Sequence, residues 1–262
     1  NSRILNRVGR HHYLQQRRGA SKNLRRSSKR TRVNTSRELL WQTGRCFLYA
    51  NNKRAVFSLG CVFILTALHV LRSRSSPFIN VIGQVMPISV DGMIPVIRKW
   101  IEMADQINIP IQFETHRNCI TNDLYSTLQL LDAIPEMRMC SDLSHYVVDR
   151  EFWFPLSDRD LGMISRILNR SDSFQGRVAS RQQIQLQIDF PQHQKWVNLF
   201  KDWWFEGISG WKSRNQNGTC YFLCELGPPE YAITDANGKE LSNRWNEALK
   251  IKSWIEGIWE KS

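Results

Sequence analysis

The chain has 262 residues, of which 42% are hydrophobic and 23% charged, a composition typical of a globular protein with one large or two ordinary domains. Its formal net charge of +12 is unevenly distributed, because residues 1–54 hold 15 Lys or Arg residues and one acidic residue, Glu38. The remaining 21 basic and 23 acidic residues give residues 55–262 a net charge of −2. Residues 55–262 therefore lack the excess of basic residues that is typical of nucleic-acid-binding domains.

The first segment, residues 1–54, is irregular as well as basic. Residues 1–37 are rich in Arg, Ser, Asn and Gln and show no apolar periodicity. This composition predicts a disordered or atypical segment with no strand or helix in residues 1–37. Two other interpretations are an arm that binds nucleic acid or another anionic surface, and a stretch that is not native to the fold of the remaining chain.

An apolar segment and linker follow at residues 55–76. The run AVFSLGCVFILTALHVL at 55–71 is flanked by Lys and Arg and lies at the lower length limit of a membrane span. A buried strand followed by a helix is the interpretation we favour. The chain has six cysteines, none in a CxxC pair, which indicates reduced, buried thiols. We therefore expect a cytoplasmic protein, with membrane association through 55–71 as the alternative.

Residues 77–262 show a regular alternation of strands and amphipathic helices, which is typical of a parallel sheet covered by helices. We expect a helix that carries Leu124, Leu128 and Leu131 after a cap at Thr121 or Asn122, and a helix capped by Ser157. The expected strands lie in 78–86, 107–113, 137–140, 173–180 and 219–224, and the other helices at 93–106, 192–206 and 242–260.

The spacing of these strands predicts a (β/α) TIM-type barrel of the α/β class. An open doubly wound sheet is the alternative, but the sequence has neither a GxGxxG motif nor a P-loop. A closed barrel of this type has about eight strands, more than residues 77–262 supply. We therefore expect a partial barrel, made of its C-terminal βα units, whose open edges favour a homo-oligomer.

Four successive predicted strands end on polar residues: Glu114, Asp142, the pair Gln175 and Arg177, and Glu225. In a parallel barrel these strand ends converge near the axis, where three carboxylates would repel one another unless a divalent cation neutralised them. Oxygen ligands favour Mn²⁺ or Mg²⁺ over Co²⁺ or Zn²⁺. The sequence therefore predicts a metal site with Glu114, Asp142, Gln175 and Glu225 as ligands.

Four further residues are candidates for substrate binding. Arg177 is expected to share a strand face with Gln175 and to hold an anionic or hydroxyl-rich substrate. His116 and His145 follow the strand ends closely and can hydrogen-bond a substrate hydroxyl. Trp153, in a loop above the expected site, is the candidate for stacking on a sugar ring. The other tryptophans, for example Trp203 and Trp204, are expected to pack in the core.

The motifs FETHR, DLSH, QGRVASRQQIQ and CELGPPEY, taken in this order, resemble the xylose-isomerase-like TIM-barrel family of the sugar phosphate isomerase/epimerase type, over residues 78–262. The resemblance implies one divalent metal and proton transfer by Glu114 and Glu225 next to the carbonyl of a sugar or sugar phosphate. Where the family usually reads His-x-Arg, this chain reads Gln175-Gly176-Arg177.

Two alternatives to the isomerase remain open at this point. A degenerate, non-catalytic barrel would serve as a binding module, and the amide at position 175 favours that interpretation. An endonuclease-type metal hydrolase would share the barrel and use residues 1–54 to hold DNA. The chain has six histidines, fewer than the histidine-rich metal cluster of such hydrolases would lead one to expect.

Overall fold

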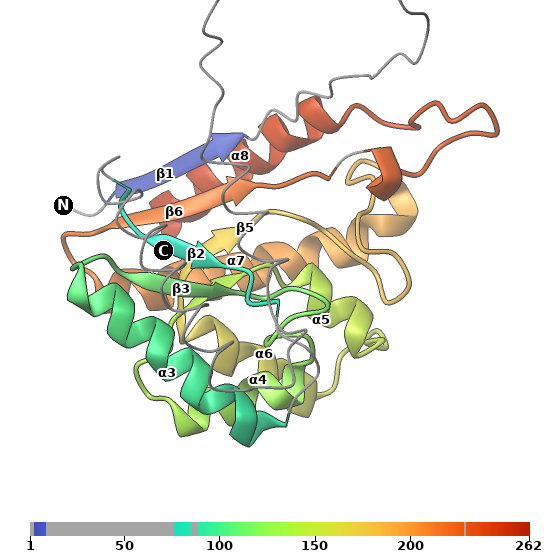
Figure 1. Cartoon of the computed structure of the whole chain (residues 1–262). Coiled ribbons are helices and arrows are strands. Elements are labelled where there is room, and N and C mark those ends of the chain that lie inside the picture. Colours follow the sequence, from blue (N-terminus) through green and yellow to red (C-terminus); the bar gives the residue numbers. More distant parts are fainter. Residues whose placement is uncertain (1–2, 9–75, 85–88, 228) are drawn as a thin grey trace, which may run out of the picture.

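The computed structural model describes residues 3–8, 76–84, 89–227 and 229–262 (Figure 1). The strands are β1 (Arg3–Val8), β2 (Ile79–Val81), β3 (Ile111–Glu114), β4 (Met139–Ser141), β5 (Ser171–Gln175) and β6 (Thr219–Cys224). The helices are α3 (Val90–Gln106), α4 (Leu124–Ala133), α5 (Ser144–Asp149), α6 (Asp158–Leu168), α7 (Gln194–Arg214) and α8 (Arg244–Lys261). Two short 3₁₀ helices are η1 (Pro191–His193) and η2 (Pro229–Tyr231).

All strands run parallel in one sheet with the order β1-β6-β5-β4-β3-β2. Helix α6 packs against β4, α7 against β5, and α8 against β6 and β1. The sheet curls, because the ring of Phe78, just before β2, lies 5.0 Å from that of Tyr221 in β6, although three strands separate β2 from β6. The predicted partial (β/α) barrel is confirmed.

Strand β1 contradicts the expectation of no regular structure in residues 1–37. It pairs with β6 in parallel register, from Arg3 opposite Thr219 to Val8 opposite Cys224. The sequence of β1, RILNRV, has little alternation of its own, and the ladder of β6 supplies its backbone partners. The rest of the basic segment and the apolar run 55–71 lie outside the described residues. In the part of the chain that is described, no helix is long and apolar enough to cross a membrane.

The helix caps explain where two helices begin. Ser157 caps α6 as predicted, and its side chain accepts a hydrogen bond from the Asp160 amide. The predicted cap of α4 is wrong, because Asp123 takes that role and accepts a hydrogen bond from the Ser126 amide. Thr121 is occupied elsewhere: its hydroxyl donates to the Glu114 carbonyl and thereby fixes the turn that follows β3.

The outer face of the sheet forms the hydrophobic core with the helices. The Trp204 indole, 1% exposed, meets the ring of Phe222 edge-on at 5.5 Å between centroids. Core packing of Trp203 and Trp204 is thus confirmed, whereas Trp245 on α8 is 41% exposed. The cysteines of the described residues, Cys119, Cys140, Cys220 and Cys224, are free and buried, as expected.

The inner face of the sheet is polar. Cys140, Ser173 and Gln175 lie on this face, and the hydroxyl of Ser173 donates to the side-chain oxygen of Gln112. In β6 the inward residues Tyr221 and Leu223 are only half-buried, while the outward Phe222 is 1% exposed. The inner face of β3 and β5 therefore carries amide and hydroxyl groups beneath the strand ends, whereas that of β6 carries Tyr221 and Leu223.

Candidate active site

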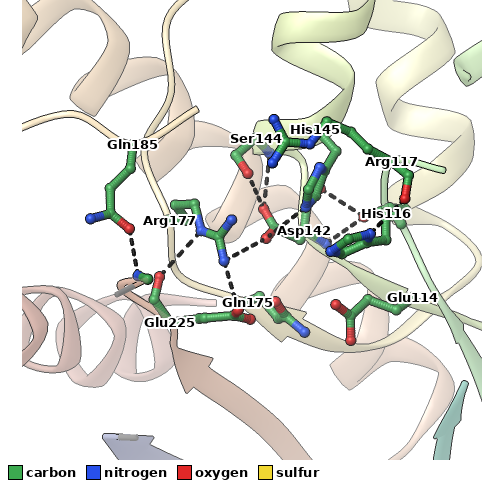
Figure 2. A network of polar contacts seen from close by, with 12 residues as sticks. Glu114, His116, Arg117, Asp142, Ser144, His145, Gln175, Arg177, Gln185 and Glu225 are labelled. Carbon is green, nitrogen blue, oxygen red and sulfur yellow. Dashed lines mark hydrogen bonds and ion pairs between the residues drawn. The ribbon is translucent and has the colours of Figure 1, made fainter. Parts of the chain in front are cut away.

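The carboxyl edge of the sheet brings the predicted residues together (Figure 2). Glu114 and Gln175 are the last residues of β3 and β5, and Asp142 and Glu225 directly follow β4 and β6. Because the strands are parallel and adjacent, their carboxyl ends share one edge of the sheet. The parallel order of the strands thus places residues that are far apart in sequence in one polar cluster.

Arg177 lies at the centre of this cluster (Figure 2). Its Nη2 is 2.6 Å from Glu225 Oε1 and 3.6 Å from Asp142 Oδ2, and its Nε donates to the Glu225 carbonyl at 3.5 Å. Burial opposes its charge, but the two carboxylates prevail and raise the pKa of Arg177. The prediction that β5 extends through 173–180 is wrong, since the strand ends at Gln175 and Arg177 reaches the carboxylates from the following loop.

Glu114 is 5% exposed and accepts a hydrogen bond from the side-chain amide of Asn80. Burial, with the negative charges of Glu225 and Asp142, raises the pKa of Glu114 to about 8. The sequence reasoning missed Asn80, whose strand it predicted. The available signal was the single amide in the apolar run FINVIG.

The other two carboxylates differ from Glu114 in their partners. Burial alone would raise the pKa of Asp142, but Arg177, His145 and hydrogen bonds from Ser144 lower it below its usual value. For Glu225, burial prevails over the adjacent Arg177 and the pKa is raised. The site therefore combines one carboxylate that stays ionised with two that hold a proton more readily than exposed acids.

The two predicted histidines form a pair above Asp142. Their ring centroids are 4.5 Å apart, and His145 Nε2 is 3.6 Å from Asp142 Oδ2. Burial lowers the pKa of His145 to about 4 and also lowers that of His116, so both rings are neutral at pH 7. Neutral rings can donate or accept a hydrogen bond at a substrate hydroxyl.

Trp153 lies apart from the contacts described so far. Its side chain is 72% exposed, and the guanidinium of Arg181 lies 3.7 Å above its ring centroid. Sugar stacking by Trp153 stays a prediction.

The loop after β6 has supports that the sequence reasoning did not identify. Gln185 accepts a hydrogen bond from the Gly227 amide at 2.6 Å, and Arg244 donates to the Gly227 carbonyl. Further along, the ring of Tyr231 lies 5.0 Å from the guanidinium carbon of Arg177. These contacts hold the segment that begins with Glu225 against the rest of the site.

Oxygen atoms without a partner show where the site could bind a cation. Asn80 Oδ1, Asp142 Oδ2 and Gln175 Oε1 are buried and have no hydrogen-bond partner. No three His, Cys, Asp or Glu side chains among the described residues are grouped so that they could hold a metal. The amide oxygens would therefore have to complete any cation site, and such hard oxygen donors fit Mg²⁺ or Mn²⁺.

Comparison with solved structures identifies the fold. A xylose isomerase-like TIM barrel protein from Mycobacterium smegmatis, solved in complex with magnesium, matches with a TM-score of 0.52 and 12% identity, over 77% of this chain and 68% of that one. The fold is that of the xylose isomerase-like TIM barrels. An L-ribulose 3-epimerase matches with a TM-score of 0.52 and 11% identity, over 89% of this chain and 82% of that one. No protein-family model and no curated protein matches the sequence.

Proposed function

We propose that the chain is a divalent-metal-dependent isomerase or epimerase of a sugar or sugar phosphate, acting by proton transfer at a carbon next to a carbonyl. The observation that carries this proposal is the arrangement of Glu114 and Glu225 at the ends of β3 and β6. The charge of Glu225 raises the pKa of Glu114, and both carboxyls have raised pKa values. Glu114, whose pKa is raised to about 8, can take up and release a proton near neutral pH, which suits general acid–base catalysis.

Each residue of the cluster has a role in this reaction. Glu225, oriented by its contact with Arg177 at 2.6 Å, accepts the carbon-bound proton, and Glu114 returns a proton to the product. His116 and His145 provide neutral hydrogen-bonding groups for substrate hydroxyls. Trp153 stacks on the sugar ring. In an epimerisation the proton leaves from one face of the carbon and returns to the other, which requires two carboxyl groups.

A divalent cation fits the donor set, because three buried oxygen atoms, Asn80 Oδ1, Asp142 Oδ2 and Gln175 Oε1, have no hydrogen-bond partner. Asp142 and the amide oxygens of Gln175 and Asn80 would hold it, whereas the predicted ligands Glu114 and Glu225 are not grouped with Asp142 as metal ligands in the described residues. When bound, such a cation stabilises the negative charge that develops on the carbonyl oxygen as the neighbouring proton leaves. Asp142, which is lowered in pKa by Arg177 against the effect of burial, supplies a permanent negative charge for the cation.

The test is exchange of the carbon-bound proton with solvent. D-fructose, D-ribulose and their phosphate esters are incubated with the full chain and Mg²⁺ or Mn²⁺ in D₂O, and deuterium in the sugar is followed by NMR. We expect incorporation with at least one of them, and a fall of about 10²–10⁴ in its rate for Glu114→Gln and for Glu225→Gln.

The matched control is Glu256→Gln, because Glu256 pairs with Lys252 on α8 and its side chain is 49% exposed. This variant should exchange at the wild-type rate. Equal rates in the wild type, Glu114→Gln and Glu225→Gln would contradict the assignment. Binding of these sugars without any exchange would support a non-catalytic binding module in place of the enzyme.

A further inference from the structure

Two arginines flank one tyrosine beside the proposed active site. The guanidinium carbon of Arg177 lies 5.0 Å from the ring centroid of Tyr231, and that of Arg117 lies 5.9 Å from it. Arg117 Nη2 donates to the Tyr231 hydroxyl at 3.4 Å. The three residues come from the loops after β3, β5 and β6, so the fold itself brings two positive charges to this side of the strand ends.

The two arginines differ in burial and in partners. Arg177 is 2% exposed, and its Nη2 and Nε bind Asp142 and Glu225, whereas its Nη1 is buried without a hydrogen-bond partner. Arg117 is exposed at the rim, and among the described residues no carboxylate forms an ion pair with it. A buried guanidinium nitrogen without an acceptor is unfavourable, and an oxygen atom of a ligand would satisfy it.

The neighbouring groups favour an anion as that ligand. His145 is 1% exposed, and its Nδ1 and Nε2 also have no hydrogen-bond partner, so another donor is available next to Arg177. The Tyr231 hydroxyl accepts a hydrogen bond from Arg117, and a hydroxyl that accepts one hydrogen bond can still donate its proton to a ligand. Planar guanidinium groups and a hydroxyl match the several oxygens of a phosphate or carboxylate better than a single neutral hydroxyl group.

We propose that the substrate of this site carries an anionic group, a phosphate or a carboxylate, bound by Arg117, Tyr231 and the Nη1 of Arg177. This inference rests on the proposed function, since it specifies the substrate of the same site. The anionic group would occupy the rim beside the loop after β6, and the carbonyl end of the substrate would face Glu114 and Glu225. Arg117 would contribute most of the binding affinity for the anionic group. Arg177 would contact the anionic group through Nη1 while it pairs with Asp142 and Glu225.

The first experiment measures binding of inorganic phosphate and of acetate to the full chain by calorimetry, with EDTA present so that no cation holds the anion. We expect one of the two anions to bind, and its affinity to fall about tenfold or more in Arg117→Gln, since a charge-assisted contact is lost. Arg117→Lys should retain part of the affinity. Tighter binding of phosphate assigns a phosphate ester, and tighter binding of acetate assigns a sugar acid.

The control is Arg166→Gln, because Arg166 is an exposed arginine that pairs with Asp132 on the outer helices. This variant should bind the anion with the same affinity as the wild type. Equal affinity of the wild type and Arg117→Gln would overturn the proposal, because the anion would then bind elsewhere, for example at the basic residues 1–54. Failure of both anions to bind would overturn it as well.

The second experiment separates this proposal from the proposed function. Deuterium exchange is compared for D-ribulose, D-ribulose 5-phosphate and D-glucuronate, in the wild type and in Arg117→Gln. A kcat/KM that is higher for one charged sugar than for D-ribulose, and that falls about tenfold or more in Arg117→Gln, supports both the anion site and the proposed function. Exchange of the neutral sugar alone overturns the anion proposal and leaves the proposed function intact. Arg117-dependent phosphate or acetate binding without exchange of any sugar supports the anion site and contradicts the proposed function.

Discussion

Arg177→Met removes the only buried cation that contacts two carboxylates in the described residues, and the structure allows its effect to be estimated. Arg177 is 2% exposed, and the side chain of Asp142 is 1% exposed, so Asp142 would remain as a buried charge without its partner. Breaking a buried pair in this way costs about 3–5 kcal/mol. Glu225 adds less to this value, because its side chain is 27% exposed and water can replace the lost contact.

The assay is urea unfolding of the wild type and Arg177→Met at pH 7 and at pH 4, with EDTA present. Arg177 lowers the pKa of Asp142 against the effect of burial, so without Arg177 that pKa rises. In the variant Asp142 then takes up a proton as the pH falls. The difference in free energy of unfolding between the wild type and Arg177→Met should therefore be smaller at pH 4 than at pH 7.

The control is Arg166→Met, where the paired side chains are 49% and 67% exposed and about 0–1 kcal/mol is expected. A loss below about 1 kcal/mol in Arg177→Met at pH 7, or a difference that does not narrow at pH 4, would refute the reasoning.

Three further predictions follow from single contacts. In α8 a methyl group at Gly257 meets nothing within 4 Å, so Gly257→Ala should stabilise the chain by about 0.5–1 kcal/mol in urea unfolding. In α7 a Cβ at Gly207 would lie 2.6 Å from the Phe174 ring, so Gly207→Ala should destabilise the chain. An equal effect of the two substitutions would contradict this packing. Because the pKa of Glu114 is raised in the folded chain, the folded chain keeps a proton that the unfolded chain releases. Without metal, the melting temperature of the wild type should therefore fall as the pH rises from about 4.5 to about 8, and it should fall less in Glu114→Gln. Mg²⁺ or Mn²⁺ should raise the melting temperature of the wild type and not that of Asp142→Asn, and identical shifts would remove Asp142 from the cation site.

Local sequence patterns were enough to predict the repeating strand–helix units and the acidic residues at three of the strand ends. Alternating apolar strands and amphipathic helices are local patterns, and they located β2 to β6, α3, α4, α6, α7 and α8. Some ends were wrong, since β5 ends at Gln175 and α7 continues to Arg214, beyond the expected ends at 180 and 206. Because the carboxyl ends of adjacent parallel strands lie at a common edge, the sequence alone predicts that Glu114, Asp142 and Glu225 lie near one another. Ser157 was recognised as a helix cap because a cap depends only on its own few residues.

Several contacts of the site depend on how distant segments pack and could not be predicted from local patterns. Strand β1 forms on the ladder that β6 offers, and RILNRV carries no sufficient pattern of its own. Asn80 acquires its role because β2 lies beside β3, and Arg177 because a loop turns its guanidinium back between Asp142 and Glu225. Strand formation depends on residues near in sequence, whereas the pairing of a buried charge depends on the position of every surrounding strand, and no local pattern encodes that position.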